Sequence, residues 1–295
     1  MFKKPLRVVV GVSLFLFVTY EVLCFLAEPV EDHPYFNPDH FLVIAHRGGR
    51  GLGPENTLFL FRRSVKLGAD VLEIDLRSTE DGELVILHDS TVDRTTNGHG
   101  PVRDLTLAEL KNLDAAYHWT PDNGGSFPLR GNEIRVPTLA EVFGAFPQIR
   151  LNIELKESRP EVATSLCNLI EEYQKSDRVM VASFKAATLK QFRSVCPDVA
   201  TSAAASEALP FYWLQRIHLE SVYSPPAQAL QIPQYYGEKE VITPRLIETA
   251  HSRNMRIHVW TINDVNRMQR LIDLGVDGIM TDYPDRLLEL LGGDR

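Results

Sequence analysis

The fold is easiest to recognise in a stretch that begins Phe41-Leu42-Val43-Ile44-Ala45-His46-Arg47-Gly48-Gly49. Its apolar part is a predicted strand. Two more predicted strands follow, Val71-Leu72-Glu73-Ile74-Asp75-Leu76 and Leu84-Val85-Ile86-Leu87-His88. Two histidines, an arginine and two carboxylates therefore lie in these strands or at their ends, where α/β enzymes usually carry catalytic groups. We interpret residues 46–89 as half of an active site.

Apolar runs alternate with amphipathic helical segments through the rest of the chain, which predicts a parallel sheet covered by helices. We predict strands at 41–46, 71–76, 84–88, 149–155, 178–183, 199–203, 220–223, 256–261 and 277–281. Helices are predicted at 56–67, 138–146, 160–175, 186–195, 206–216, 243–253, 264–274 and 284–291. About eight β/α units in about 250 residues fit an α/β protein with a TIM (β/α)8 barrel better than an open sheet.

Residues 90–136 interrupt this alternation. We interpret them as a small insertion after the second β/α unit, lying over the mouth of the barrel. A loop of this length is usually functional or disordered. It is either a lid that shapes the substrate site or a solvated insertion.

The N-terminus differs in composition from the rest of the chain. Lys3, Lys4 and Arg7 precede an apolar run that continues, apart from Glu21, to Ala27. About 20 apolar residues can cross a bilayer as a helix, so we predict a transmembrane anchor at 1–27, a linker at 28–40 and the barrel at 41–295. A cleavable signal peptide is the competing interpretation. The basic residues before the span predict a cytoplasmic N-terminus and an extracytoplasmic catalytic domain.

Charge and cysteine content narrow the possible functions. The formal net charge is -8, which argues against nucleic acid as a partner, because such a partner requires a basic face. The three cysteines, Cys24, Cys167 and Cys196, lack the spacing of a zinc site or a disulfide framework. We expect free cysteines, with a Cys167–Cys196 bridge as the less favoured alternative. The oligomeric state is left open.

Three carboxylates are candidate metal ligands. Side chains alternate along a strand, so Glu73 and Asp75 point to the same face. Glu154 lies in Leu151-Asn152-Ile153-Glu154-Leu155-Lys156, which alternates in the same way. An all-oxygen set suits one hard divalent cation, Mg²⁺ or Ca²⁺. The alternative is a pair of surface carboxylates on an edge strand.

His46 and His88 are candidate catalytic residues, because imidazole can accept and donate a proton near neutral pH. The alternative for each is a structural histidine. Arg47 and Lys156 are candidate phosphate ligands.

Trp260 could bind the alcohol part of a substrate, or pack inside the barrel. Asp282 could cap the last helix or touch substrate. The apolar run Leu209-Pro210-Phe211-Tyr212-Trp213-Leu214 could contact an acyl chain or a bilayer, or pack as a helix core.

The chain resembles the glycerophosphodiester phosphodiesterase family over about residues 41–291. The resemblance rests on short motifs in family order, among them His46-Arg47-Gly48, Glu55-Asn56-Thr57, Glu73-Ile74-Asp75, His88-Asp89, Asn152-Ile153-Glu154-Leu155-Lys156, Trp260-Thr261-Ile262-Asn263 and Thr281-Asp282-Tyr283-Pro284. It implies a TIM barrel with a small insertion and metal binding by Glu73, Asp75 and Glu154. It also implies acid–base roles for His46 and His88, phosphate contacts from Arg47 and Lys156, and Trp260 near the alcohol.

We therefore hypothesise a membrane-anchored, metal-dependent hydrolase that converts glycerophosphodiesters to an alcohol and sn-glycerol 3-phosphate. A lysophospholipase D with the same site is the alternative, and the anchor favours it by holding the barrel near lipid. A non-catalytic glycerophosphodiester-binding module is a third hypothesis. It is disfavoured because the chain keeps both histidines and all three carboxylates.

Overall fold

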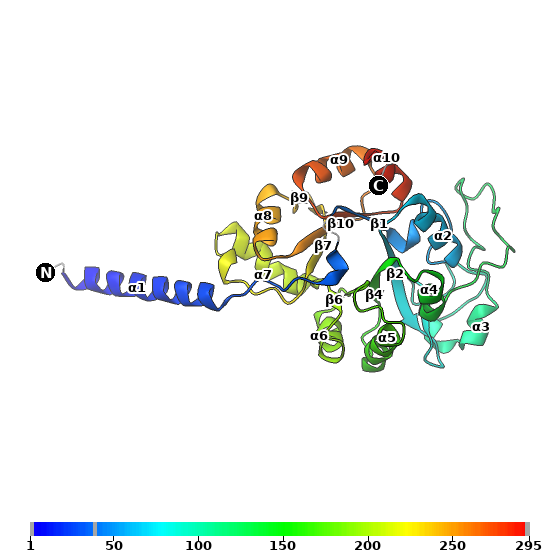
Figure 1. Cartoon of the computed structure of the whole chain (residues 1–295), viewed down its shortest axis with the longest axis horizontal. Coiled ribbons are helices and arrows are strands. Elements are labelled where there is room, and N and C mark those ends of the chain that lie inside the picture. The colour runs from blue at the N-terminus through cyan, green and yellow to red at the C-terminus, as the bar shows by residue number, and fades with distance from the viewer. Residues whose placement is uncertain (1–2, 38–39, 293–295) are drawn as a thin grey trace.

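The computed structural model describes residues 3–37 and 40–292. The described residues form a ring of eight parallel strands with helices around it (Figure 1). In chain order these strands are β1 (Leu42–Ala45), β2 (Val71–Ser78), β4 (Arg150–Leu155), β5 (Val179–Ala182), β6 (Ala200–Thr201), β7 (Ala229–Pro233), β10 (Arg256–Trp260) and β11 (Gly278–Thr281). β1 pairs with both β2 and β11, and a parallel bridge between Ser202 and Ala229 joins β6 to β7. The predicted (β/α)8 barrel is confirmed.

One helix follows each barrel strand in the sequence. These helices are α2 (Leu58–Leu67), α4 (Leu139–Ala145), α5 (Pro160–Glu172), α6 (Ala186–Val195), α7 (Ala205–Arg216), α8 (Pro244–Ser252), α9 (Val265–Leu274) and α10 (Pro284–Leu290). Thr57, Thr138, Thr243 and Asp264 accept hydrogen bonds from the first-turn N–H groups of α2, α4, α8 and α9. Such N-caps stabilise the first turns of these four helices. The predicted starts of all eight helices agree with the structure within about two residues.

Two strand predictions are wrong as barrel strands. Residues 84–88 contain β3 (Leu84–Ile86), which pairs antiparallel with β2 outside the ring. Residues 220–223 contain a 3-10 helix, η4 (Glu220–Val222), and the barrel strand of this unit is β7. Tyr223 is instead buried with its hydroxyl donating to the carbonyl of Glu207. The prediction missed β7 because Gln231 and Pro233 make its sequence resemble a loop.

The insertion follows the second barrel strand and ends at α4. It contains a short helix, α3 (Leu107–Lys111), and a separate small core formed by side chains that include Val92, Val102 and Leu110. Because these side chains are buried against one another, much of the insertion is a packed structure.

The N-terminal helix α1 (Lys3–Leu26) extends away from the barrel on the side of α7 and α8 (Figure 1). Its segment Val8–Leu26 is long and apolar enough to cross a membrane, and it is not buried against the protein. A signal sequence would have the same length and composition. Beyond α1, a 3-10 helix η1 (Pro34–Phe36) buries Tyr35 completely with Met180, Ala200 and Ala229. The segment after α1 is therefore part of the folded domain.

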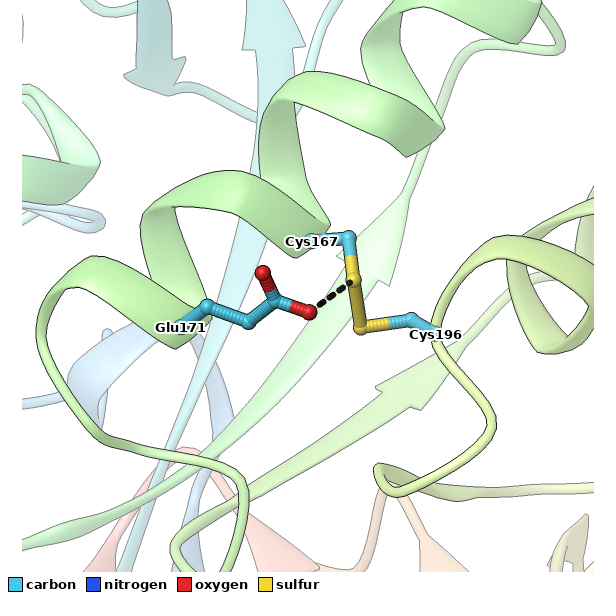
Figure 2. Close-up of side chains that lie close together, drawn as sticks. All are labelled: Cys167, Glu171 and Cys196. Carbon is cyan, nitrogen blue, oxygen red and sulfur yellow. Dashed lines mark hydrogen bonds between the residues drawn. A yellow bond between two sulfur atoms is a disulfide. The ribbon is translucent and has the colours of Figure 1, made fainter.

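Cys167 and Cys196 form a disulfide, so the expectation of free cysteines is wrong for this pair (Figure 2). Cys167 lies on α5 and Cys196 directly after α6, and these helices are neighbours. The pairing was missed because 29 residues separate the two positions in sequence, and only the packing of α5 on α6 brings them together. Cys24 is the free cysteine of the described residues. Glu171 lies beside the bridge, but bonded sulfurs are not thiolates and cannot serve as thiolate ligands.

Candidate active site

A tight turn after β1 carries two of the predicted site residues, His46 and Arg47, and both line the site cavity. Arg47, Gly48 and Gly49 all have positive φ, at 49°, 82° and 88°. A Cβ on Gly48 would lie 2.4 Å from a ring carbon of Phe61, so only glycine fits there. A non-glycine residue with positive φ is uncommon and often functional. In this conformation the backbone N–H of Arg47 donates to Glu73 at 2.7 Å.

The three predicted ligands, Glu73, Asp75 and Glu154, come together in the barrel. Their carboxylate oxygens lie within 4.8 Å of one another. Glu73 and Asp75 are buried and Glu154 is partly buried. The register explains the cluster, because β2 pairs with β4 so that Asp75 lies opposite Glu154.

Two basic side chains, Lys156 and Arg47, balance part of the negative charge of the three carboxylates. Lys156 Nζ lies 2.9 Å from Asp75 and 2.7 Å from Glu154, and Arg47 Nε lies 3.6 Å from Asp75. Burial alone would raise the pKa of Asp75, but Lys156 and Arg47 hold it below its usual range. Burial, together with the neighbouring Asp75 and Glu154 charges, instead raises the pKa of Glu73 well above its usual range. Negative charge is therefore incompletely compensated at Glu73.

The carboxylate cluster suits a divalent cation. It offers oxygen donors only, as Mg²⁺ and Ca²⁺ prefer. A cation here would offset the burial and the repulsion that raise the pKa of Glu73, because buried charge is tolerated when it is paired or bound to a metal. The donor set and the electrostatics of the described residues thus fit the predicted cofactor.

Both predicted histidines are held by aspartates. His46 Nδ1 donates to Asp282 at 2.6 Å, and His88 Nδ1 donates to Asp89 at 2.7 Å. A carboxylate on Nδ1 orients the ring and leaves Nε2 as the nitrogen that can exchange protons with a bound molecule. Burial is the main reason that the pKa of His88 lies below its usual value, although the Asp89 bond opposes this effect.

A charged network links the two histidine sides of the site. Arg94 donates to Asp89 at 2.7 Å and to Glu55 at 2.6 Å, and Arg47 donates to the same Glu55 oxygen at 2.9 Å. Hydrogen bonds from His88 and Arg94 outweigh burial and lower the pKa of Asp89. Asp89 is thus held as a carboxylate that can keep accepting from His88.

The site opens into a cavity of about 420 Å³ with two different walls. The polar wall carries both histidines, Glu73, Glu154 and the cations Arg47 and Lys156. The opposite wall is mainly apolar, with Phe184, Ile232, Pro233 and Trp260. Phe184 and Trp260 pack edge to face with ring centroids 5.8 Å apart. The cavity can therefore accept a ligand with an anionic end and a less polar end.

The structure brings all eight predicted site residues together. Seven of them line the cavity, and the eighth, Asp75, is buried and pairs with the cavity residue Lys156. Sequence reasoning missed the roles of Asp282, Asp89, Glu55 and Arg94. Asp282 does not cap α10; it holds His46 and also accepts from Arg50 and Asn263. The adjacency of His88 and Asp89 was a usable signal for one of these pairs.

Fold and site together indicate a (β/α)8-barrel enzyme with its site at the carboxyl ends of the strands, where barrel enzymes carry their catalytic groups. The model of the glycerophosphoryl diester phosphodiesterase family matches residues 46–286. A glycerophosphodiester phosphodiesterase from Caldanaerobacter subterraneus is 36% identical over 255 residues, which cover 85% of this chain and 97% of that protein.

Two further relatives are informative. A phosphodiesterase from Oleispira antarctica, solved in complex with the product sn-glycerol-3-phosphate, is 28% identical with a TM-score of 0.69, covering 84% of this chain and 95% of that one. A lysophospholipase D from Rattus norvegicus is 26% identical, covering 84% of this chain and 85% of that protein. The chain belongs to the glycerophosphoryl diester phosphodiesterase family, and the resemblance found in the sequence is confirmed.

Proposed function

We propose that the protein hydrolyses glycerophosphodiesters to an alcohol and sn-glycerol 3-phosphate, and that it depends on one divalent cation. The observation that carries the proposal is that two aspartate-held histidines, His46 and His88, line one cavity together with the basic side chains Arg47 and Lys156. The carboxylate cluster of Glu73, Asp75 and Glu154 lies at the same place. The product-bound Oleispira relative supports this substrate class.

Each residue of the polar wall has a task in this proposal. Arg47 and Lys156 bind the phosphate, the first through two N–H groups and the second as a point charge. One histidine removes the proton of the attacking oxygen, and the other protonates the alcohol oxygen as its bond to phosphorus breaks. A cation held by Glu73, Asp75 and Glu154 would neutralise charge on the phosphate. Trp260 packs against the alcohol.

The histidine roles can be tested with matched variants. His46→Ala and His88→Ala should each lower kcat/KM for glycerophosphocholine by about a hundredfold or more, because each removes one proton transfer. His99→Ala is the control: His99 also pairs with an aspartate, Asp93, but is exposed and lies outside the cavity. Near-normal turnover in either site variant would contradict the assignment.

Lysophospholipase D activity is the second candidate. The apolar wall around Phe184 and Trp260 could accept more than a small alcohol, and the rat relative is a lysophospholipase D. Parallel assays with glycerophosphocholine and lysophosphatidylcholine distinguish the two. Hydrolysis of the lysolipid alone would replace the first candidate by the second.

We also propose that α1 is an uncleaved single-pass anchor with a cytoplasmic N-terminus and an extracytoplasmic catalytic domain. Basic residues precede the apolar segment Val8–Leu26, and acidic residues follow it. The Cys167–Cys196 bridge adds support, because disulfides persist mainly in oxidising compartments. Protease added to sealed membrane vesicles whose outer surface is the extracytoplasmic one should digest the barrel, whereas protection until the vesicles are permeabilised would reverse the topology.

A further inference from the structure

Helix α7 has one buried and one exposed apolar face. Phe211 is completely buried in the core, whereas Leu209, Trp213 and Ile217 are 54%, 56% and 63% exposed. Residues four apart lie on the same side of a helix, so Leu209 and Trp213 share one face, and Ile217 follows as the cap residue after the last turn. These three residues are here named the α7 row. Single exposed apolar residues are normal, but a contiguous row often marks an interaction surface.

The α7 row lies next to the exit of α1 from the barrel. Ile217 is the cap residue directly after α7, and the 3-10 helix η4 begins three residues later and contacts α1. Tyr20 of α1 lies beside Ser221 of η4. In Figure 1 the helix α1 leaves the barrel on this same side.

The segment after α1 is fastened to the barrel near this exit. The N–H of Val30 donates to the carbonyl of Arg253 at 3.1 Å. Asn254 Nδ2 donates to Val30 and to Asp32, each at 2.9 Å. With these contacts in place, a bilayer that holds α1 lies close to the α7 side of the barrel.

We propose that the α7 row rests in the interface of the bilayer that α1 spans, so that the barrel lies on its side against the membrane. The inference rests on the proposed membrane anchor. A bilayer is favoured as the occupant because the row lies on the side of the barrel from which the apolar helix α1 extends, and because tryptophan prefers the membrane–water interface. Ala205 and Ala208 of the same helix line the site cavity, so one helix separates that cavity from lipid.

The test uses the full chain in phosphatidylcholine nanodiscs made with or without brominated acyl chains, which quench tryptophan on contact. The tryptophans are Trp119, Trp213 and Trp260, so the difference between wild type and Trp213→Phe isolates the signal of Trp213. We expect brominated lipid to remove most of this difference signal. Hydrolysis of glycerophosphocholine, measured on the same samples, should be unchanged by Trp213→Phe, which lies outside the cavity.

A matched control places a tryptophan on the other side of the barrel. Leu67 at the end of α2 is 43% exposed, and α2 lies opposite α1 (Figure 1). Leu67→Trp in the Trp213→Phe background should show no quenching. An unquenched Trp213, equal quenching at both positions, or failure of the chain to enter nanodiscs would each overturn the proposal. Since quenching does not require turnover, its result is independent of the catalytic assignment.

Discussion

His46 Nδ1 lies 2.6 Å from Asp282 Oδ1, although 236 positions separate the two residues in the sequence. β1 and β11 are paired strands, with Ala45 opposite Thr281, so the residues that follow each strand meet at the same edge of the barrel. The closure of the barrel thus creates one half of the proposed acid–base pair.

Asp282→Asn should lower kcat by roughly tenfold or more, because an amide no longer fixes the ring of His46 as a carboxylate does. The matched control is Asp264→Asn, since Asp264 caps α9 and asparagine is an equally good cap. Steady-state kinetics of both variants check the prediction. Unchanged kcat in Asp282→Asn would remove the aspartate from the mechanism.

Glu73→Gln should abolish the response of the protein to a divalent cation. A ligand that binds the folded state raises Tm according to its concentration and affinity, so wild-type Tm should rise when Mg²⁺ or Ca²⁺ is added after chelation. The variant should show little or no rise, and Glu171→Gln, which changes a carboxylate beside the disulfide, should behave as wild type. Full activity of wild type in chelator would refute the metal site itself.

Acid should destabilise the protein partly through His258. This histidine is completely buried with both ring nitrogens unpartnered, and burial lowers its pKa to about 4. The unfolded chain has a histidine pKa of about 6.5 and takes up a proton first, so stability present above pH 6.5 is lost as pH falls towards 4. This difference between the histidine pKa of the unfolded and the folded chain corresponds to a loss of roughly 3 kcal/mol at most in the free energy of unfolding.

His258→Leu should therefore lose less stability than wild type between pH 7 and pH 4.5. Urea unfolding at the two pH values measures this difference, and the carboxylates that titrate in both proteins cancel. An identical loss in both proteins would show that His258 does not titrate as described.

Reduction should destabilise the barrel through the Cys167–Cys196 bridge. The bridge joins positions 29 residues apart and so lowers the conformational entropy of the unfolded chain. In the chain-entropy model this stabilises the folded state by about 3–4 kcal/mol. Tm should fall when a reductant is added, and Cys167→Ser/Cys196→Ser should have a low Tm that is insensitive to the reductant. Thiol titration of the denatured, unreduced protein should find only the Cys24 thiol; three thiols would contradict the bridge.

Local patterns in the sequence determined most of the fold. The alternation of apolar strands with amphipathic helices predicted the barrel and placed the helix starts within about two residues. Where local pattern was weak the prediction failed: β7 carries Gln231 and Pro233, and residues 220–223 resemble a strand but form η4. The eight proposed site residues were also chosen from sequence, because alternation along β2 and β4 shows which side chains share a face.

Only the tertiary structure decided which distant residues meet. The Asp282–His46 bond, the Arg94–Glu55 bond and the Cys167–Cys196 bridge all join residues from different β/α units. The same holds for the two faces of α7, where Phe211 is buried and Trp213 is exposed. Periodicity reports which side chains lie on one face of an element. Which face meets the core, and which neighbour it meets, depends on how the barrel closes and how its helices pack.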